Sequence, residues 1–484
     1  MESNNGRIEK AEDQDRLSSL TDDVLLSILG KVDIATAART AVLSTRWKHL
    51  PWLLPELTID AKNFLPSPLP NPIEAEHIDT AMASLTKAVR SFLAIRQCEA
   101  TISSLQLKLY LVDNYSEIIG PLLSEVIVVG TVKDLDLAVL GKKEPEDCND
   151  KDMLQQACSV DGFFRTYPGL LHCLTRLSLY NICFDERDMN HFLFDCCKQL
   201  RYLYLSNCDT GELPAWKIHA PDSNISVLEL ETCYLGKLDV LHLPKLERLH
   251  WDGWMCPNAP LSFGVVPALK ELQLLSGAAV YFKGFNLSEV LRGTMIKNLT
   301  LNFQGEKLWM QPEGKQLCTV FNKLTKLCLH DIFVEFDLLW TIVLLEAAPS
   351  IEVFDLEIWE HPCTMGPEAR GKTYGERTNP SWKLSEFTNG KEWLLKEVQI
   401  TGFSPMDQQM TFIRAVMERA PNLRTLVLKD YSPCEDCEQM GVLPRSERLP
   451  AERVYPKDKE EQDMVVNQLI GHMACCHVDI TFGV

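Results

Sequence analysis

The chain has 484 residues, of which 46% are hydrophobic and 24% charged, a composition typical of globular proteins. This composition excludes wholesale disorder, a collagen-like fibre and a small disulfide scaffold. Its 67 acidic residues outnumber its 48 Lys and Arg residues and give a net charge of −19. Because phosphate backbones and anionic lipid surfaces attract positive charge, this balance argues against both nucleic-acid and membrane binding.

Residues 1–15 are polar and charged and predict a disordered leader. The first 30 residues hold no uninterrupted apolar segment of the kind found in signal peptides, and no stretch reaches 18 uncharged apolar residues. The 17 cysteines are therefore expected to be reduced and mostly buried. These features favour a soluble intracellular protein.

Residues 16–60 predict a small unit of three short helices. Thr21 can cap a first helix that ends at Gly30, Asp33 can cap a second helix, and Ser44 a third. A unit of about 40 residues buries little apolar surface, so it normally needs a further contact for stability.

Residues 61–100 predict a linker followed by a connecting helix. The proline-rich segment at 66–72 favours an extended conformation. Residues 77–97 have the 3.6-residue apolar period of an amphipathic helix. Its expected apolar face consists of Met82, Leu85, Val89 and Phe92.

From residue 101 to residue 430 one pattern repeats: an apolar residue, two variable residues, an apolar residue, one variable residue and an apolar residue. It occurs twelve times, with middle apolar residues Leu105, Leu135, Leu177, Leu203, Leu228, Leu249, Leu272, Leu299, Leu327, Phe354, Val398 and Leu426. Successive intervals are 21–30 residues except for 42 and 44 at two polar insertions, which matches leucine-rich repeats.

Each such repeat supplies one short strand and a return segment, and stacking the repeats buries their leucines. The sequence therefore predicts an α/β fold, a leucine-rich-repeat solenoid with a curved parallel sheet on its concave face. We expect helices at 185–198, 335–347 and 407–420, and irregular or short-helix return segments between residues 208 and 269. Residues 431–484 predict a tail whose helix at 457–474 caps the solenoid.

Two cysteines, Cys208 and Cys233, lie at the repeat position where a small buried side chain packs beside the turn. Five other residues fall at variable strand positions that point to the concave face when the apolar positions point inward. They are the expected substrate-binding residues Tyr180, Tyr202, Tyr204, His250 and Asp252. The alternative interpretation is a solvated sheet face without a ligand.

The sequence gives little support for a catalytic, nucleotide-binding or metal-binding site. Residues 366–373 match the spacing of a P-loop, but Gly375 and Pro380 oppose the helix that must follow it. Cys434 and Cys437, with His and Cys residues at 472–477, leave a zinc site open, although their spacing exceeds that of zinc fingers. We expect no catalytic residue, no cofactor and no metal.

Residues 17–50 resemble the F-box of plant F-box proteins, most closely in DDVLLSIL, AARTAVLS and RWKHL. The repeats resemble the leucine-rich repeats of the same family, and residues 393–430 its C-terminal FBD segment. The resemblance implies that the F-box binds a Skp-type adaptor and, through it, cullin and RING subunits. The implied adaptor-binding and stabilising residues are Leu17, Leu20, Leu25, Ile28, Leu29, Leu43 and Trp47.

The resemblance thus implies a non-catalytic substrate receptor of an SCF-type ubiquitin ligase in the nucleus, the cytoplasm or both. Its repeats would bind a substrate protein of unknown identity. Two alternatives remain: a leucine-rich scaffold that acts outside any ligase, and a nucleotide-dependent switch at residues 366–373.

Overall fold

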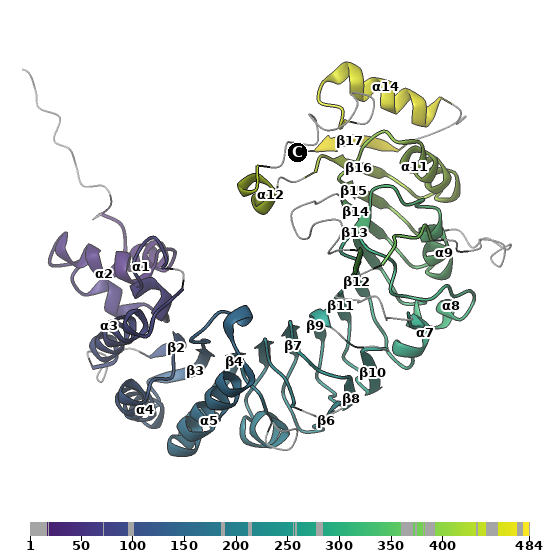
Figure 1. The fold of residues 1–484 in the computed structure, drawn as a ribbon. Helices are drawn as coiled ribbons and strands as arrows, with labels where there is room; N and C mark the ends of the chain where they lie inside the picture. The colour runs from purple at the N-terminus through teal and green to yellow at the C-terminus, as the bar shows by residue number, and fades with distance from the viewer. Residues whose placement is uncertain are drawn as a thin grey trace, which may run out of the picture. The chain divides into compact units, whose positions relative to one another are not determined.

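The computed structural model describes residues 17, 19–70, 72–94, 101–184, 189–211, 215–254, 256, 259–276, 284–359, 371–372, 375–380, 382, 393–431, 434–441, 454–471 and 478–483. The predicted leader at 1–15 lies outside these residues. The chain divides into two compact units (Figure 1), Met1–Lys143 with Ser159–Thr175, and Glu144–Cys158 with Arg176–Val484.

The first unit combines helices with a short parallel sheet. Its helices are α1 (Asp22–Leu29), α2 (Ile34–Arg39), α3 (Ala75–Ala94) and α4 (Asp113–Val128), with short 3-10 helices η1 (Thr40–Val42), η2 (Leu50–Leu53), η3 (Ala61–Phe64) and η5 (Pro168–His172). Its strands are β1 (Glu56–Asp60), β2 (Ile102–Leu109) and β3 (Val132–Val139). Helix α5 (Asp150–Thr166) crosses the boundary between the units.

The first two predicted helices are confirmed, and Asp33 caps α2 by accepting the Thr36 amide at 2.9 Å. The third predicted helix is wrong. Residues 45–49 form turns, and η2 begins only at Leu50. Pro51 has no backbone N–H, so an α-helix that starts after Ser44 would lose a hydrogen bond there after less than two turns.

The sheet begins earlier than the repeats predict. β1 pairs in parallel with β2, with Leu57 opposite Leu105, although β1 lies in the range that the sequence assigns to the F-box. Leu54, Leu57 and Ile59 fit the six-residue pattern and are buried, but Leu57 lies 48 residues before Leu105, outside the regular interval, so the segment was not predicted as a repeat. The predicted connecting helix is α3, and its four expected apolar residues are buried.

In the second unit, parallel strands line one side of an arc and helices lie on the other (Figure 1). The strands follow chain order: β4 (Leu174–Tyr180), β5 (Tyr202–Ser206), β7 (Val227–Glu231), β9 (Arg248–Trp254), β11 (Glu271–Ser276), β12 (Asn298–Asn302), β13 (Lys326–Phe333), β14 (Val353–Trp359), β15 (Glu397–Thr401), β16 (Thr425–Lys429) and β17 (Asp479–Gly483). All twelve predicted repeats hold a strand, β2 and β3 included, so that prediction is confirmed.

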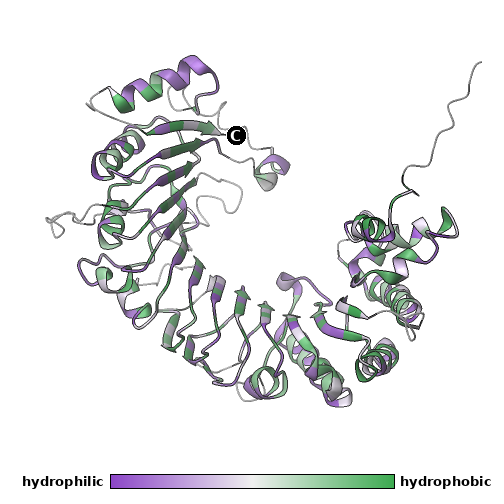
Figure 2. Ribbon diagram, turned by 180° about the vertical axis from the view of Figure 1, so that it is seen from behind, coloured by the Kyte–Doolittle hydropathy of each residue, from purple (hydrophilic) through white to green (hydrophobic). Residues whose placement is uncertain are grey.

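Three return segments form a second parallel sheet of β6 (Trp216–His219), β8 (Leu238–His242) and β10 (Leu261–Val265). The prediction of irregular or helical returns there is therefore wrong. Apolar residues on these strands alternate into the core, among them Trp216, Ile218 and Val240. In Figure 2 the strands of this unit carry both hydrophobic and hydrophilic residues, as expected for a sheet with one buried face.

The remaining returns are helical: η6, a π-helix (His191–Cys196), α7 (Leu287–Val290), α8 (Leu317–Val320), α9 (Trp340–Ala347) and α11 (Asp407–Arg419). η4 (Pro145–Asp147) precedes α5, and α12 (Glu435–Gln439) and α14 (Lys459–Ile470) follow the repeats. The helices predicted at 335–347, 407–420 and 457–474 correspond to α9, α11 and α14. The one predicted at 185–198 is partly described and contains the π-helix.

The cysteine positions at the turns are confirmed. Cys208 and Cys233 are buried, and their thiols donate to the carbonyls of Leu179 and Leu205, at 3.6 and 3.3 Å. Cys256 is also buried, and its thiol donates to the Leu235 carbonyl at 3.1 Å. Among the described residues, no helix combines the length and the apolar character needed to cross a bilayer.

Candidate protein-binding surfaces

The seven residues implied for the F-box divide by burial. Three are buried in the unit and form its core: Leu25, Leu29 and Trp47. Three are exposed: Leu17, Ile28 and Leu43. Leu20 is half-buried. The buried three stabilise the fold and cannot contact a partner directly, so the exposed residues are the candidates for docking.

The exposed residues belong to a larger apolar set. Of the eighteen exposed large apolar side chains among the described residues, seven lie between residues 17 and 53. Four of these were not predicted: Val24, Val32, Val42 and Leu53. The sequence carried a signal for one of them, because Val24 lies one helical turn before Ile28 on α1.

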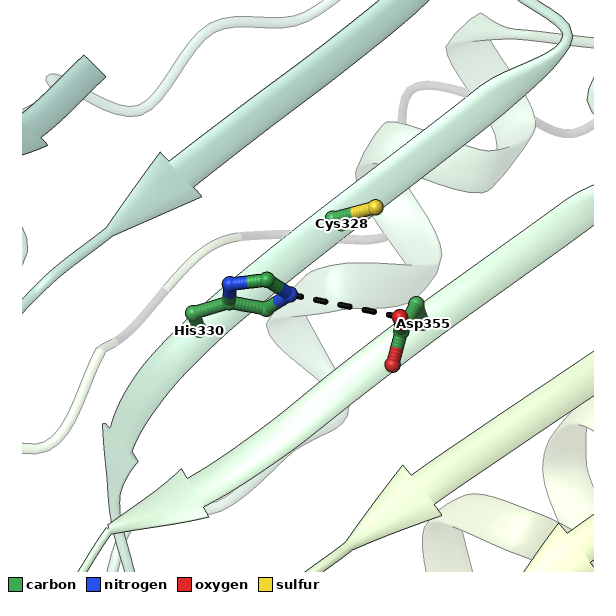
Figure 3. A group of neighbouring side chains, drawn as sticks. All are labelled: Cys328, His330 and Asp355. Atoms are coloured by element: carbon green, nitrogen blue, oxygen red, sulfur yellow. Dashed lines mark ion pairs between the residues drawn. The ribbon is translucent and has the colours of Figure 1, made fainter. Parts of the chain in front are cut away.

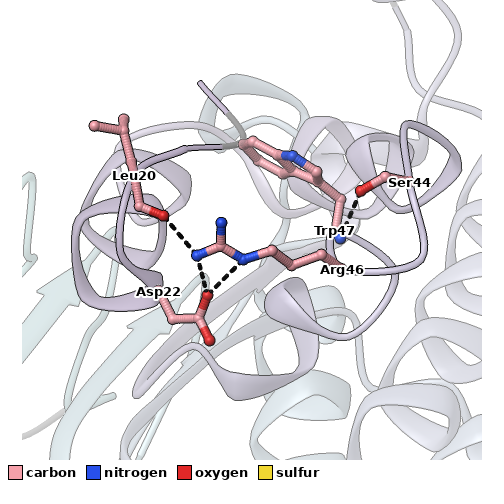
Figure 4. A network of polar contacts seen from close by, with 5 residues as sticks. All are labelled: Leu20, Asp22, Ser44, Arg46 and Trp47. Carbon is pink, nitrogen blue, oxygen red and sulfur yellow. Dashed lines mark hydrogen bonds and ion pairs between the residues drawn. The ribbon is translucent and has the colours of Figure 1, made fainter. Parts of the chain in front are cut away.

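The Arg46 side chain connects the turn after the second helix to the start of the first helix through hydrogen bonds (Figure 4). Its Nε and Nη2 atoms donate to Asp22 Oδ1 at 2.9 and 2.5 Å, and Nη2 also donates to the Leu20 carbonyl at 2.5 Å. The Trp47 amide donates to Ser44 Oγ at 3.3 Å in the same turn. This contact was not predicted, and it holds Leu20 at the N-terminus of α1.

The second surface lies on the strands of the second unit. Tyr180 lies on β4, Tyr202 and Tyr204 on β5, and His250 and Asp252 on β9, and all five are half-buried. The strands between them are in register, so that Glu229 on β7 lies between Tyr204 and His250. Similarly, Glu231 lies between Ser206 and Asp252.

Two tyrosines donate to two carboxylates of the next strand. Tyr202 Oη donates to Glu229 at 2.5 Å, and Tyr204 Oη donates to Glu231. Burial, followed by these hydrogen bonds, raises the pKa of both tyrosines. Both hydroxyls therefore stay protonated and keep donating, which leaves each carboxylate with further lone pairs for a ligand.

Neighbouring groups complete this face. The rings of Tyr180 and Tyr204 lie 5.5 Å apart, and the Arg176 guanidinium lies 4.0 Å from the centre of the Tyr202 ring. His250 Nδ1 lies 2.8 Å from Gln273 Oε1 on β11. Burial raises the pKa of Asp252, and the Glu231 carboxylate adds to the rise.

The structure thus brings the five predicted residues onto one face, where Glu229 and Glu231 accept hydrogen bonds from Tyr202 and Tyr204 and lie in register with His250 and Asp252. The sequence analysis did not identify Glu229 and Glu231 as partners of the tyrosines. Half-buried carboxylates beside aromatic rings can bind cationic and amide groups of a protein partner.

The two other candidate sites fall largely outside the described residues. Only Gly371 and Lys372 of the P-loop-like motif are described. Cys437 lies in α12 and Cys434 lies directly before it, and both are half-buried. Residues 472–477 lie outside the described part.

Parallel strands at a period of 21–30 residues, each with alternating buried leucines, define a leucine-rich-repeat protein. Residues 154–460 match the family model described as At1g61320/AtMIF1, LRR domain, and the chain belongs to this family of plant F-box/leucine-rich-repeat proteins.

Two Arabidopsis thaliana relatives agree with this assignment. The F-box/FBD/LRR-repeat protein At2g04230 is 23% identical, over 74% of this chain and 78% of its own length. The F-box protein At4g27050 is 25% identical, over 60% of this chain and 67% of its own length. A solved structure, the TLR13–ssRNA13 complex, aligns with a TM-score of 0.32 and 13% identity, over 68% of this chain and 47% of that one.

Proposed function

We propose that this chain is the substrate-recognition subunit of an SCF-type (Skp–cullin–F-box) ubiquitin ligase. The observation that carries the proposal is the concentration of exposed apolar side chains between residues 17 and 53. Large exposed apolar patches on a folded unit mark surfaces that a partner covers. In the F-box family, that partner is a Skp-type adaptor, which links the receptor to cullin and RING subunits.

In this proposal the concave face of the second unit binds the substrate protein. The tyrosine–carboxylate pairs around Glu229 and Glu231 support it, because aromatic and charged groups of this kind suit a protein partner. The chain makes and breaks no bond in ubiquitin transfer. It holds the substrate near the ubiquitin-carrying enzyme. Its contribution to the reaction is this proximity, and other subunits carry out the chemistry. The role also predicts a nuclear or cytoplasmic location, or both.

The experiment is co-purification of the full chain with a plant Skp-type adaptor. The test variant combines Ile28→Asp with Leu43→Asp, which are exposed positions, whereas substitution of the buried Leu25 would unfold the unit. Central interface residues contribute about 2 kcal/mol or more each, so each charge is expected to weaken adaptor binding by at least about 30-fold.

A matched control places the same charge elsewhere on the same unit. Val128→Asp with Val129→Asp changes two exposed apolar residues at the end of α4, and it should bind the adaptor like the wild type. If the Ile28/Leu43 variant binds as well as the wild type, these exposed residues are not the adaptor-binding surface. If the folded wild type fails to bind the adaptor, the ligase role is rejected. A leucine-rich scaffold outside the ligase then becomes the better description.

A further inference from the structure

Three side chains that can ligate metal converge on neighbouring strands, away from the tyrosine cluster (Figure 3). Cys328 and His330 lie on β13 and Asp355 lies on β14. Their ligand atoms, Sγ, a ring nitrogen and a carboxylate oxygen, all lie within 4.8 Å of one another. Cys328 is buried, and the other two side chains are 28% and 20% exposed.

The repeat geometry explains this convergence. Residues two apart on a strand share a face, so Cys328 and His330 point the same way. Cys328 pairs in register with Asp355, one repeat later. A bulge follows Leu329 and contains Asp331, whose φ is +52°. Bulges re-aim the side chains beside them, here that of His330.

The spacing fits a tetrahedral ion. Zinc lies about 2.3 Å from a thiolate sulfur and about 2.0–2.2 Å from nitrogen or oxygen, which places neighbouring ligand atoms about 3.3–3.6 Å apart. Because the ligand atoms of Cys328, His330 and Asp355 lie within 4.8 Å of one another, they need to close by about 1.5 Å at most, which side-chain rotation can supply.

The two nitrogens of His330 face two different carboxylates. Nε2 lies 4.0 Å from Asp355 Oδ2, as the dashed line in Figure 3 marks, and Nδ1 lies 3.8 Å from Glu357 Oε2. Metal-ligating histidines commonly bind the ion through one nitrogen and donate the other N–H to a carboxylate. Glu357 is placed for that orienting role.

The donor set discriminates among metals. Magnesium and calcium take oxygen ligands, whereas a thiolate and an imidazole select zinc or a similar borderline-soft ion. We infer that Cys328, His330 and Asp355 bind a zinc ion, with Glu357 orienting His330. Three protein ligands leave the fourth tetrahedral position for water or a ligand atom. The inference does not depend on adaptor binding.

The test is zinc binding by the full chain, treated with chelator and then titrated with zinc against a chromophoric competitor. One equivalent should bind to the wild type. His330→Gln, Asp355→Asn and Cys328→Ser should each weaken binding by more than about 100-fold, the upper end of the range for outer-shell partners. Glu357→Gln should weaken it by about 10–100-fold, as expected for such a partner.

Cobalt provides a second readout. A cobalt-loaded wild type should show a thiolate-to-metal charge-transfer band in the near ultraviolet, and Cys328→Ser should abolish it. Because Cys328 is buried, circular dichroism must show that this variant is folded, and His330→Gln tests the same site at a more exposed position.

Two controls locate the metal. Cys318→Ser changes a half-buried cysteine on α8, and His242→Gln changes a half-buried histidine on β8, and both should keep wild-type affinity. A Cys434→Ser, Cys437→Ser variant tests the alternative site. Absence of zinc binding, or binding that survives His330→Gln and is lost in the Cys434/Cys437 variant, would overturn the inference.

Discussion

The short and the long repeats of the second unit differ in how the chain returns from one strand to the next. Between Leu203 and Leu272 the repeats span 25, 21 and 23 residues, and their returns are the strands β6, β8 and β10. Between Leu299 and Phe354 they span 28 and 27 residues, and their returns contain the helices α8 and α9.

The two kinds of return differ because a strand and a helix span different distances per residue. A strand advances about 3.3 Å per residue and a helix about 1.5 Å, so the 5 residues of β8 cover about 17 Å and the 13 residues of α11 about 20 Å. A repeat with few residues can span the outer side only in an extended conformation. Repeat length therefore decides the return type, and the strands of the main sheet stay in register in both regions.

The largest effect is expected where the insertion of the longest repeat is anchored. Arg377 Nη2 lies 3.2 Å from Glu306 Oε1, and its guanidinium lies 3.9 Å from the centre of the Phe333 ring. The Glu306 side chain is 7% exposed, so Arg377→Ala removes the cation from a buried carboxylate. We expect a loss of about 3 kcal/mol, the low end for breaking a buried ion pair.

Hydrogen exchange identifies which strands lose stability in the Arg377→Ala variant. Repeat proteins are stabilised mainly between neighbours, so exchange should accelerate in β13 and β14 and stay unchanged in β5 and β7. Arg292→Ala, at an exposed arginine of the same unit, should change stability by no more than about 0.5 kcal/mol. Uniform acceleration across both regions would show that the two kinds of repeat unfold together.

A smaller effect tests the strand returns. A Cβ atom on Gly264 of β10 would lie 2.3 Å from the Leu241 carbonyl oxygen of β8, so Gly264→Ala must separate the two strands. Overpacking of this kind costs about 1–3 kcal/mol. Chemical denaturation with hydrogen exchange should locate the loss in β8 and β10.

The control for that substitution is a glycine with space around it. Apart from its chain neighbours and the backbone of its own helix, no described heavy atom lies within 4 Å of a Cβ built on Gly162 in α5. Gly162→Ala should therefore stabilise the chain by about 0.5–1 kcal/mol, because alanine favours the helix. If Gly264→Ala does not lower the stability either, the second sheet contributes little to the stability of the chain. The short and long repeats then differ in the shape of their returns but not in how much those returns stabilise the fold.

The twelve main strands could be predicted because each combines an apolar pattern with a constant interval. The strands β1, β6, β8, β10 and β17 were not predicted. Residues 54–59, 213–218 and 235–240, which lead into β1, β6 and β8, fit the apolar pattern but fall outside the constant interval, whereas β10 and β17 lack the pattern. The concave position of the tyrosines follows from strand alternation. Whether an apolar F-box residue faces the core, like Leu25, or water, like Ile28, depends on packing between helices.

The site of Cys328, His330 and Asp355 was missed for a different reason. The residues are separated in the chain by one full repeat, so no short motif contains them. Aligning LTKLCL with IEVFDL places Cys328 and Asp355 in the same column, and the register of β13 and β14 then makes them neighbours. The sequence signal for this site therefore appears only when the repeats are aligned with one another.

The smallest effect concerns the carboxylates of the short repeats. Asp252 has a raised pKa because of burial and of Glu231, so the stability it contributes is present below the unfolded pKa of about 3.9 and is lost as the pH rises through its folded pKa. Asp252→Asn should therefore raise the melting temperature at pH 7, and the difference should vanish near pH 3. Asp222→Asn, at an exposed aspartate, should change neither value. A lower melting temperature at pH 7 for Asp252→Asn would instead mean that His250 or another donor holds the ionised carboxylate, so that the face of the short repeats is already electrostatically satisfied without a partner.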